Sequence, residues 1–240
     1  MIKIENVETF GWEAAIRGMR NPMNSWDKSD SYWGYDCKSC GKIERDGACK
    51  PEDEERKDCH KYLGFEIGQN DLRLMNKLSK AGNDHGKFLR MIGVDLDILA
   101  PLYWWKEFDT YKVGTVANSC NTMHKIQAKE FTLDNFSHEK LTPAALATLR
   151  SVVVRLEFAR KQFLKNKPKS EFGMQSGKDY WWDMIQLLPS SYNQRRTVQL
   201  NYAVLKNMYH ARKNHKLDEW LEFCKWVETL PYAKELIIGE

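Results

Sequence analysis

The chain has 240 residues, of which 42% are hydrophobic, and a formal net charge of +4. This apolar content is enough for the core of one large domain. Because no apolar run approaches the roughly 20 residues that span a bilayer, and the first residues lack a basic start and an apolar stretch, we predict a cytoplasmic protein without a membrane partner. The mild charge and the absence of a dense Lys/Arg run argue against binding to duplex nucleic acid.

The first predicted elements are a strand and a helix. Residues 2–10 alternate weakly between apolar and polar side chains, as in an edge strand. Asn70 can cap a helix whose apolar positions continue to Leu78, and Gly82 then ends it.

A cysteine-rich segment, residues 34–63, lies between these two elements. Its cysteines are Cys37, Cys40, Cys49 and Cys59. The spacing of the first pair allows two thiolates to share one tetrahedral metal. The segment has too few apolar residues to bury a core, so a bound metal would be needed to fold it. We predict a structural zinc site formed by the four cysteines, in which His60 can replace Cys59. The alternative is a flexible insertion with reduced thiols.

The stretch from Asp84 to Cys120 predicts a strand followed directly by an aromatic helix. Asp95 and Asp97 alternate with apolar residues, which is the two-residue period of a strand with one buried face. Pro101 suits the first turn of the helix that follows. That helix leads into a polar loop, where binding and catalytic groups often lie. The alternative is an aromatic core helix with a satisfied polar cap.

The second half of the chain predicts helices. Thr142 followed by Pro143 is a helix start, and apolar residues continue at helical spacing to about Lys165. Further helices are expected over residues 180–187, 194–212 and 218–229.

Two amides and a guanidinium occur in the expected helix over residues 194–212. Asn201, Asn207 and Arg212 are six and five positions apart, so a helix presents them within about 140° of arc. Such groups can read a base edge and hold an anion. The alternative for Arg212 is a surface salt bridge with Asp218 or Glu219, worth less than about 1 kcal/mol.

These two blocks together resemble the flavin-dependent thymidylate synthases (ThyX), over about residues 71–230. In that family a histidine precedes an Ala-Pro pair and an aromatic helix that ends in Arg-His-Arg, and a serine follows after seven residues. Here His85 lies sixteen residues before Pro101, and seven residues separate Lys112 from Cys120. The family's downstream Leu-Pro pair, two asparagines and arginine correspond to Leu188, Pro189, Asn201, Asn207 and Arg212.

The resemblance implies an α/β (α+β) fold that is mostly helical with a small sheet. It implies one ThyX-like domain over residues 1–240, in which residues 34–63 are an insertion. The implied activity is that of a flavin-dependent thymidylate synthase, the reductive methylation of dUMP to dTMP with FAD, NADPH and methylene-tetrahydrofolate. The family assembles its sites between the subunits of a homotetramer.

The resemblance also implies roles for single residues. Arg212 would be the catalytic residue and would bind substrate together with Cys120, Thr122 and Asn207. The expected cofactor-binding residues are His85, Thr110, Tyr111, Lys112, Asn118 and Asn201. We expect the Cys120 thiol to be buried and inert rather than a nucleophile.

The chain departs from the family pattern at several phosphate-binding positions. Thr110, Tyr111 and Lys112 stand at the Arg-His-Arg positions, so only Lys112 keeps a positive charge. Asn118 replaces a glutamate and Thr122 an arginine. Lys125, Arg195 and Arg196 are candidates to replace the missing cations. An enzyme of the same fold that acts on another pyrimidine nucleotide is therefore an alternative, as is a non-catalytic flavin- or nucleotide-binding protein.

Overall fold

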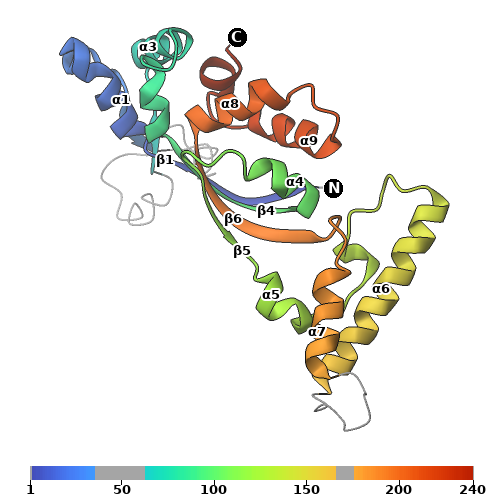
Figure 1. Ribbon diagram of the computed structural model, residues 1–240. Helices are drawn as coiled ribbons and strands as arrows, with labels where there is room; N and C mark the ends of the chain where they lie inside the picture. The colour runs from blue at the N-terminus through green and yellow to red at the C-terminus, as the bar shows by residue number, and fades with distance from the viewer. Residues whose placement is uncertain (1, 36–62, 166–175, 240) are drawn as a thin grey trace, which may run out of the picture. The chain divides into compact units, whose positions relative to one another are not determined.

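The computed structural model describes residues 2–35, 63–165 and 176–239 (Figure 1). The chain divides into two compact units. The first unit contains residues 1–8, 94–200 and 211–227, and the second contains residues 9–93, 201–210 and 228–240. The predicted mixture of helices with a small sheet is confirmed. In the described ranges, no helix is long and apolar enough to cross a membrane.

The first unit contains most of a four-stranded sheet with the strand order β1-β4-β6-β5 (Figure 1). Its strands are β1 (Lys3–Phe10), β4 (Gly93–Pro101), β5 (Val116–Ser119) and β6 (Asn193–Asn201). Strands β5 and β6 are antiparallel, and Asn118 lies opposite Thr197. As the sequence predicts, β1 is an edge strand.

Strand β4 has the predicted two-residue period. Val94, Leu96 and Ile98 are at most 1% exposed. On the opposite face, Asp97 accepts hydrogen bonds from Thr197 Oγ1 at 2.6 Å and Asn6 Nδ2 at 2.8 Å. These two hydrogen bonds hold the pKa of Asp97 below its ordinary value. One face of the sheet is therefore apolar and the other is polar.

The aromatic helix that follows β4 belongs to the core. Helix α4 (Leu102–Phe108) begins one residue after Pro101, which ends the strand instead of starting the helix. Trp104 is fully buried, and its ring centroid lies 4.8 Å from that of Trp220 in α9 (Asp218–Val227). Burial of such large rings is a major contribution to the stability of a core.

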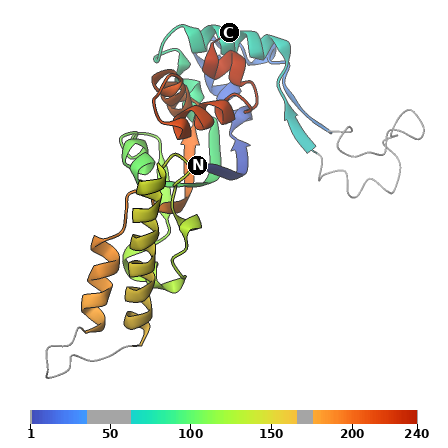
Figure 2. The ribbon, with the colours of Figure 1, turned by 90° about the vertical axis from the view of Figure 1, so that its right-hand side faces the viewer.

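Helices α6 (Pro143–Leu164) and α7 (Gly177–Gln186) lie side by side in both views (Figures 1 and 2). The predicted helix start is confirmed, because Thr142 Oγ1 accepts a hydrogen bond from Ala145 N. A small apolar core joins the two helices to the preceding loops, through residues that include Phe136, Leu149, Leu156 and Met184. The short elements before α6 are α5 (Thr122–Lys125), η5 (Ile126–Ala128) and η6 (Leu133–Asn135).

The predicted helix over residues 194–212 is wrong in its first half, where the chain forms β6. Val198 and Leu200 are each 1% exposed, whereas Thr197 and Gln199, which alternate with them, are exposed. This alternation is the period of a strand. Helix α8 (Tyr202–Arg212) starts only after Asn201, whose Oδ1 accepts a hydrogen bond from Val204 N at 3.0 Å. Asn201 is thus a strand residue that caps the helix, not a member of it.

The second unit combines helices with a two-stranded antiparallel sheet of β2 (Tyr32–Tyr35) and β3 (Leu63–Glu66). Besides most of α8, its helical elements are α1 (Trp12–Arg20), η1 (Asn21–Met23), η2 (Trp26–Lys28), α3 (Gln69–Lys80), η4 (Gly86–Met91) and the π-helix η7 (Lys234–Ile238). Helix α3 contacts both η4 and η7, and Ser79 Oγ donates to Leu236 O at 2.8 Å.

The predicted cap of α3 by Asn70 is wrong. The carboxylate of Asp30 takes that role, because it accepts hydrogen bonds from Asn70 N at 2.9 Å and Asp71 N at 3.1 Å. The capping group thus comes from a segment forty positions earlier. The predicted end is confirmed, since the helix stops at Lys80 and Gly82 has a φ of +98°.

Candidate functional site

Arg212 is the centre of a polar and aromatic cluster in the first unit. Its Nε donates to Tyr111 Oη at 2.9 Å, and its Nη1 donates to Glu107 Oε2 at 2.8 Å. The guanidinium carbon lies 4.9 Å from the ring centroid of Trp220 and 5.6 Å from that of Tyr111. Hydrogen bonds and cation–π contacts therefore fix the position of the charge.

Glu107 joins the members of this Arg212 cluster through one oxygen atom. Oε2 also accepts from Trp220 Nε1 at 3.0 Å and lies 3.3 Å from His215 Nε2. His215 Nδ1 accepts a hydrogen bond from Leu217 N at 3.1 Å, so Nε2 is the ring nitrogen that carries a proton on the side of Glu107. The carboxylate and the guanidinium balance each other in charge.

The sequence predicts Arg212 as a site residue but does not predict the partners that it has in the structure. Asp218, one of the two carboxylates expected as an alternative, pairs with Lys140 at 2.9 Å, and Glu219 accepts from Tyr103. Glu107 is 105 positions from Arg212, and no local pattern indicates that α4 and the end of α8 meet. The tyrosine at an expected flavin position, Tyr111, anchors the arginine.

The segment from Thr110 to Thr122 carries the other expected site residues of the first unit. Thr110 Oγ1 donates to Glu107 O at 2.7 Å, which closes the end of α4. Lys112 and Asn118 are exposed, and Asn118 lies on β5. Thr122 is half-buried at the start of α5. The expectation that Cys120 is buried is wrong, because its side chain is exposed at the end of β5.

Three expected site residues belong to the second unit. His85 is exposed just before η4, and Asn207 is exposed on α8. Asn201 caps α8, as described above. Of the three residues expected on one helix, only Asn207 and Arg212 share it.

The arginines expected to replace the family's missing cations are already paired. Arg195 Nη2 lies 2.8 Å from Glu5 Oε2, and Arg196 Nη1 lies 2.7 Å from Asp109 Oδ1. The guanidinium of Arg196 also lies over the ring of Trp105, at 4.2 Å from its centroid. These contacts indicate a role in holding the sheet and α4 together.

A cavity of about 430 Å³ opens in the first unit beside the start of α9. Its polar groups bond mainly to one another, since Ser137 and the backbone of His138 donate to Glu139. Burial and the hydrogen bond to Glu219 raise the pKa of Tyr103 to about 12, so its hydroxyl stays protonated. The cavity offers a ligand few polar groups without a partner.

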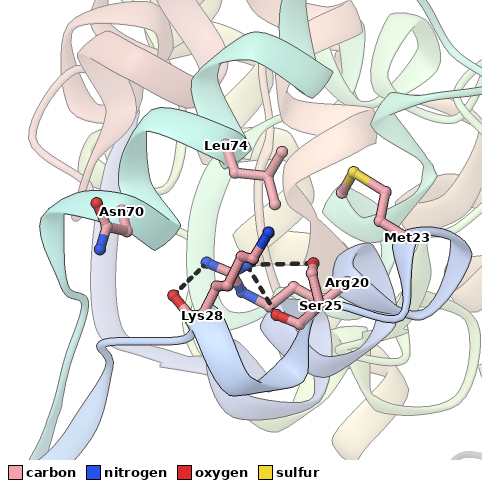
Figure 3. A pocket seen from close by; sticks show the side chains of 6 residues that line it. All are labelled: Arg20, Met23, Ser25, Lys28, Asn70 and Leu74. Carbon is pink, nitrogen blue, oxygen red and sulfur yellow. Dashed lines mark hydrogen bonds between the residues drawn. The ribbon is translucent and has the colours of Figure 1, made fainter.

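A second cavity, of about 560 Å³, lies in the second unit (Figure 3). Arg20 lines it, but each guanidinium nitrogen already donates. Nε donates to Asp71, Nη1 to Ser25 and Nη2 to the carbonyl of Lys28. This arginine therefore holds the turn between α1 and β2 and is not available as an anion site.

Across residues 2–35, 63–165 and 176–239, no group of His, Cys, Asp and Glu side chains is placed to hold a metal. The expected zinc ligands Cys37, Cys40, Cys49 and Cys59 lie outside these ranges. The zinc site therefore stays a prediction.

Comparison with solved structures identifies the fold. Thymidylate synthase X (ThyX) from Helicobacter pylori, solved with FAD and dUMP, is 15% identical and matches 99% of this chain and 97% of its own, with a TM-score of 0.58. The chain has a ThyX-like fold. The UMP/dUMP methylase PolB from Streptomyces cacaoi, bound to 5-Br dUMP, matches 100% of this chain and 94% of its own at 12% identity, with a TM-score of 0.54. No protein-family model and no curated protein sequence matches the chain.

Proposed function

We propose that the protein is a nucleotide-methylating enzyme that binds a pyrimidine nucleotide and FAD. The observation that carries this proposal is the match, over nearly the whole chain, to the folds of a thymidylate synthase and a UMP/dUMP methylase. The fixed guanidinium of Arg212 supports it, because that group can bind the substrate without a large loss of side-chain entropy. The specific reaction we propose is methylation of dUMP, with methylene-tetrahydrofolate and NADPH as co-substrates.

The residues of this chain meet the demands of a flavin nucleotide only in part. The Thr110 and Tyr111 hydroxyls make internal hydrogen bonds, and neither side chain carries the charge of the family's Arg-His pair. Lys112 is exposed and has no ion pair among the described residues, so it is available to bind a phosphate. The exposed amide of Asn118 can donate to a flavin or phosphate oxygen.

Within this proposal, Arg212 and Asn207 hold the pyrimidine nucleotide. His85, Lys112 and Asn201 bind the flavin, which supplies the reducing hydride when bound. The protein's own contribution is to orient the two ligands and to stabilise charge on the pyrimidine ring. Cys120 and Thr122 stand at substrate-contacting positions, and neither forms a covalent bond in this scheme.

A second candidate is an enzyme of the same fold that acts on a different pyrimidine nucleotide, or a protein that binds a flavin or a nucleotide without catalysis. Two observations favour it. Thr110 and Tyr111 replace cations, and the charge of Arg212 is balanced by Glu107. A site with fewer free positive charges binds a phosphate less tightly.

An FAD titration of the purified protein, followed by its visible spectrum with and without dUMP or UMP, tests the proposal. We expect stoichiometric FAD binding and a spectrum that changes when the nucleotide is added, because the proposed reaction requires the two ligands to meet. Binding of neither ligand would contradict the proposal. Rescue of a thymidine-requiring cell then separates a thymidylate synthase from the second candidate.

We further propose a closed homo-oligomer, a homotetramer in the ThyX pattern, with the outer face of α6 as an interface. Val154 is 70% exposed and Phe158 44% exposed, one turn apart on α6. The hydroxyls of Thr148 and Ser151 on this helix donate to carbonyls of the preceding turn at 3.2 Å. Their donor capacity is therefore satisfied, and the face is more apolar than its composition suggests.

Val154→Asp is expected to reduce the mass of the oligomer, because it places a charge in an apolar interface. Analytical ultracentrifugation at several protein concentrations measures this. Lys77→Asp on α3 also adds an exposed negative charge and is expected to leave the mass unchanged. An unchanged mass for Val154→Asp would exclude this face of α6 as the interface.

A further inference from the structure

Glu107 uses only one of its two carboxylate oxygens within the Arg212 cluster. Arg212, Trp220 and His215 all meet Oε2. In the part of the chain that the structure describes, Oε1 accepts no hydrogen bond and Arg212 Nη2 donates none. A buried polar atom without a partner is found at neither position, so Glu107 Oε1 and Arg212 Nη2 are both accessible to solvent. The cluster thus presents one available acceptor and one available donor.

The charge of this pair decides which part of a nucleotide it suits. The carboxylate and guanidinium neutralise each other at 2.8 Å, and the side chains are 34% and 20% exposed. A phosphate placed here would meet the negative charge of Glu107 at close range, which is unfavourable. A neutral group with a donor next to an acceptor satisfies both atoms without bringing new charge.

We infer that Glu107 is a specificity-determining residue that reads the uracil ring together with Arg212. Glu107 Oε1 accepts the N3–H of the ring, and Arg212 Nη2 donates to a neighbouring ring carbonyl. This inference rests on the proposed binding of a pyrimidine nucleotide. Cytosine has a lone pair at N3, which would face the carboxylate, so the pair selects uracil over cytosine.

Glu107→Gln tests the role of Oε1 with little change in shape. The hydrogen bonds that Arg212 and Trp220 donate to Oε2 orient the new amide so that its oxygen takes that position. Its NH₂ group then occupies the position of Oε1 and becomes a donor. A donor faces uracil N3–H unfavourably but matches the N3 lone pair of cytosine.

The experiment is calorimetric titration of the wild-type protein and the variant with dUMP and dCMP. We expect the wild type to prefer dUMP by about tenfold or more. In Glu107→Gln we expect weaker dUMP binding and a preference for dUMP that is lost or reversed. Tyr111→Phe removes an anchor of Arg212 but keeps Glu107, so it should weaken binding while leaving the preference within about twofold of the wild type.

The other possible outcomes contradict either this inference or the proposed function. If Glu107→Gln keeps the wild-type preference, Glu107 does not read N3. If it strengthens binding of both nucleotides equally, Glu107 acts only by repelling the phosphate, and the inference fails. If the wild type binds both nucleotides equally, the inference fails while the proposed function stands. If the wild type binds neither, the proposed function fails as well. Circular dichroism and thermal unfolding of each variant confirm that the comparison is between folded proteins.

Discussion

Replacement of Asp71 by alanine is expected to lower the free energy of unfolding by about 3–5 kcal/mol, since it leaves a buried charge without its partner. Arg20 is 4% exposed and Asp71 is fully buried, and Arg20 Nε lies 2.6 Å from Asp71 Oδ1. Asp71 Oδ2 also accepts from the hydroxyls of Ser29 and Ser31, at 2.7 and 2.6 Å. One carboxylate therefore fixes the chain between α1 and β2 to the start of α3.

Urea denaturation followed by circular dichroism measures this change. Asp183→Ala is a matched control, because Asp183 pairs with Arg155 at 2.7 Å on the surface of the first unit. Loss of such an exposed pair is expected to cost less than about 1 kcal/mol. A similar small cost for Asp71→Ala would show that the ion pair does not hold the second unit together.

Lowering the pH should destabilise the wild-type protein through the same carboxylate, that of Asp71. Burial alone would raise the pKa of Asp71, but hydrogen bonds from Ser31 and Ser29 and the charge of Arg20 outweigh it and lower the pKa. A lowered pKa stabilises the fold above the ordinary pKa of an aspartate, and this stability is lost as the pH falls through the lowered value. Below about pH 4, the stability difference between the wild type and Asp71→Ala should therefore shrink.

Local patterns predicted the elements that local interactions determine. The alternation around Asp95 indicated β4, and Thr142 followed by Pro143 indicated the start of α6. The failure over residues 194–201 has a local cause as well. The apolar residues of β6 recur every second position, and only the helix that follows has the longer period. The change of period at Asn201 is therefore visible in the sequence, and it marks the end of the strand and the start of the helix.

Contacts between residues that are far apart in the chain cannot be recognised from such a local sequence pattern. Arg20 and Asp71 are 51 positions apart, and Glu107 and Arg212 are 105 apart. A charged residue in a sequence does not indicate which opposite charge it will meet, and most such residues are exposed. The resemblance to ThyX predicts Arg212 as a site residue, but the partners of this arginine depend on how α4 packs against α9. The chemistry of the candidate site therefore became visible only in the structure.

Arg212→Ala is expected to weaken dUMP binding by about 10- to 100-fold, the loss typical of a charge-assisted hydrogen bond. The wild-type guanidinium is held by Tyr111 and Glu107 before any ligand arrives. Its remaining nitrogen can therefore bind a nucleotide without first ordering a long side chain. Calorimetric titration with dUMP measures the change in affinity.

Arg17→Ala supplies the control for this last prediction. Arg17 is also an arginine that pairs with a carboxylate, that of Glu13 at 3.3 Å, but it is on α1 and belongs to none of the proposed sites or interfaces. Its loss should leave dUMP affinity unchanged. Arg212→Lys keeps the charge but loses the planar fork, so it should restore only part of the affinity. Unchanged binding by Arg212→Ala would remove this cluster from the nucleotide site, because the guanidinium is the strongest donor that it contains.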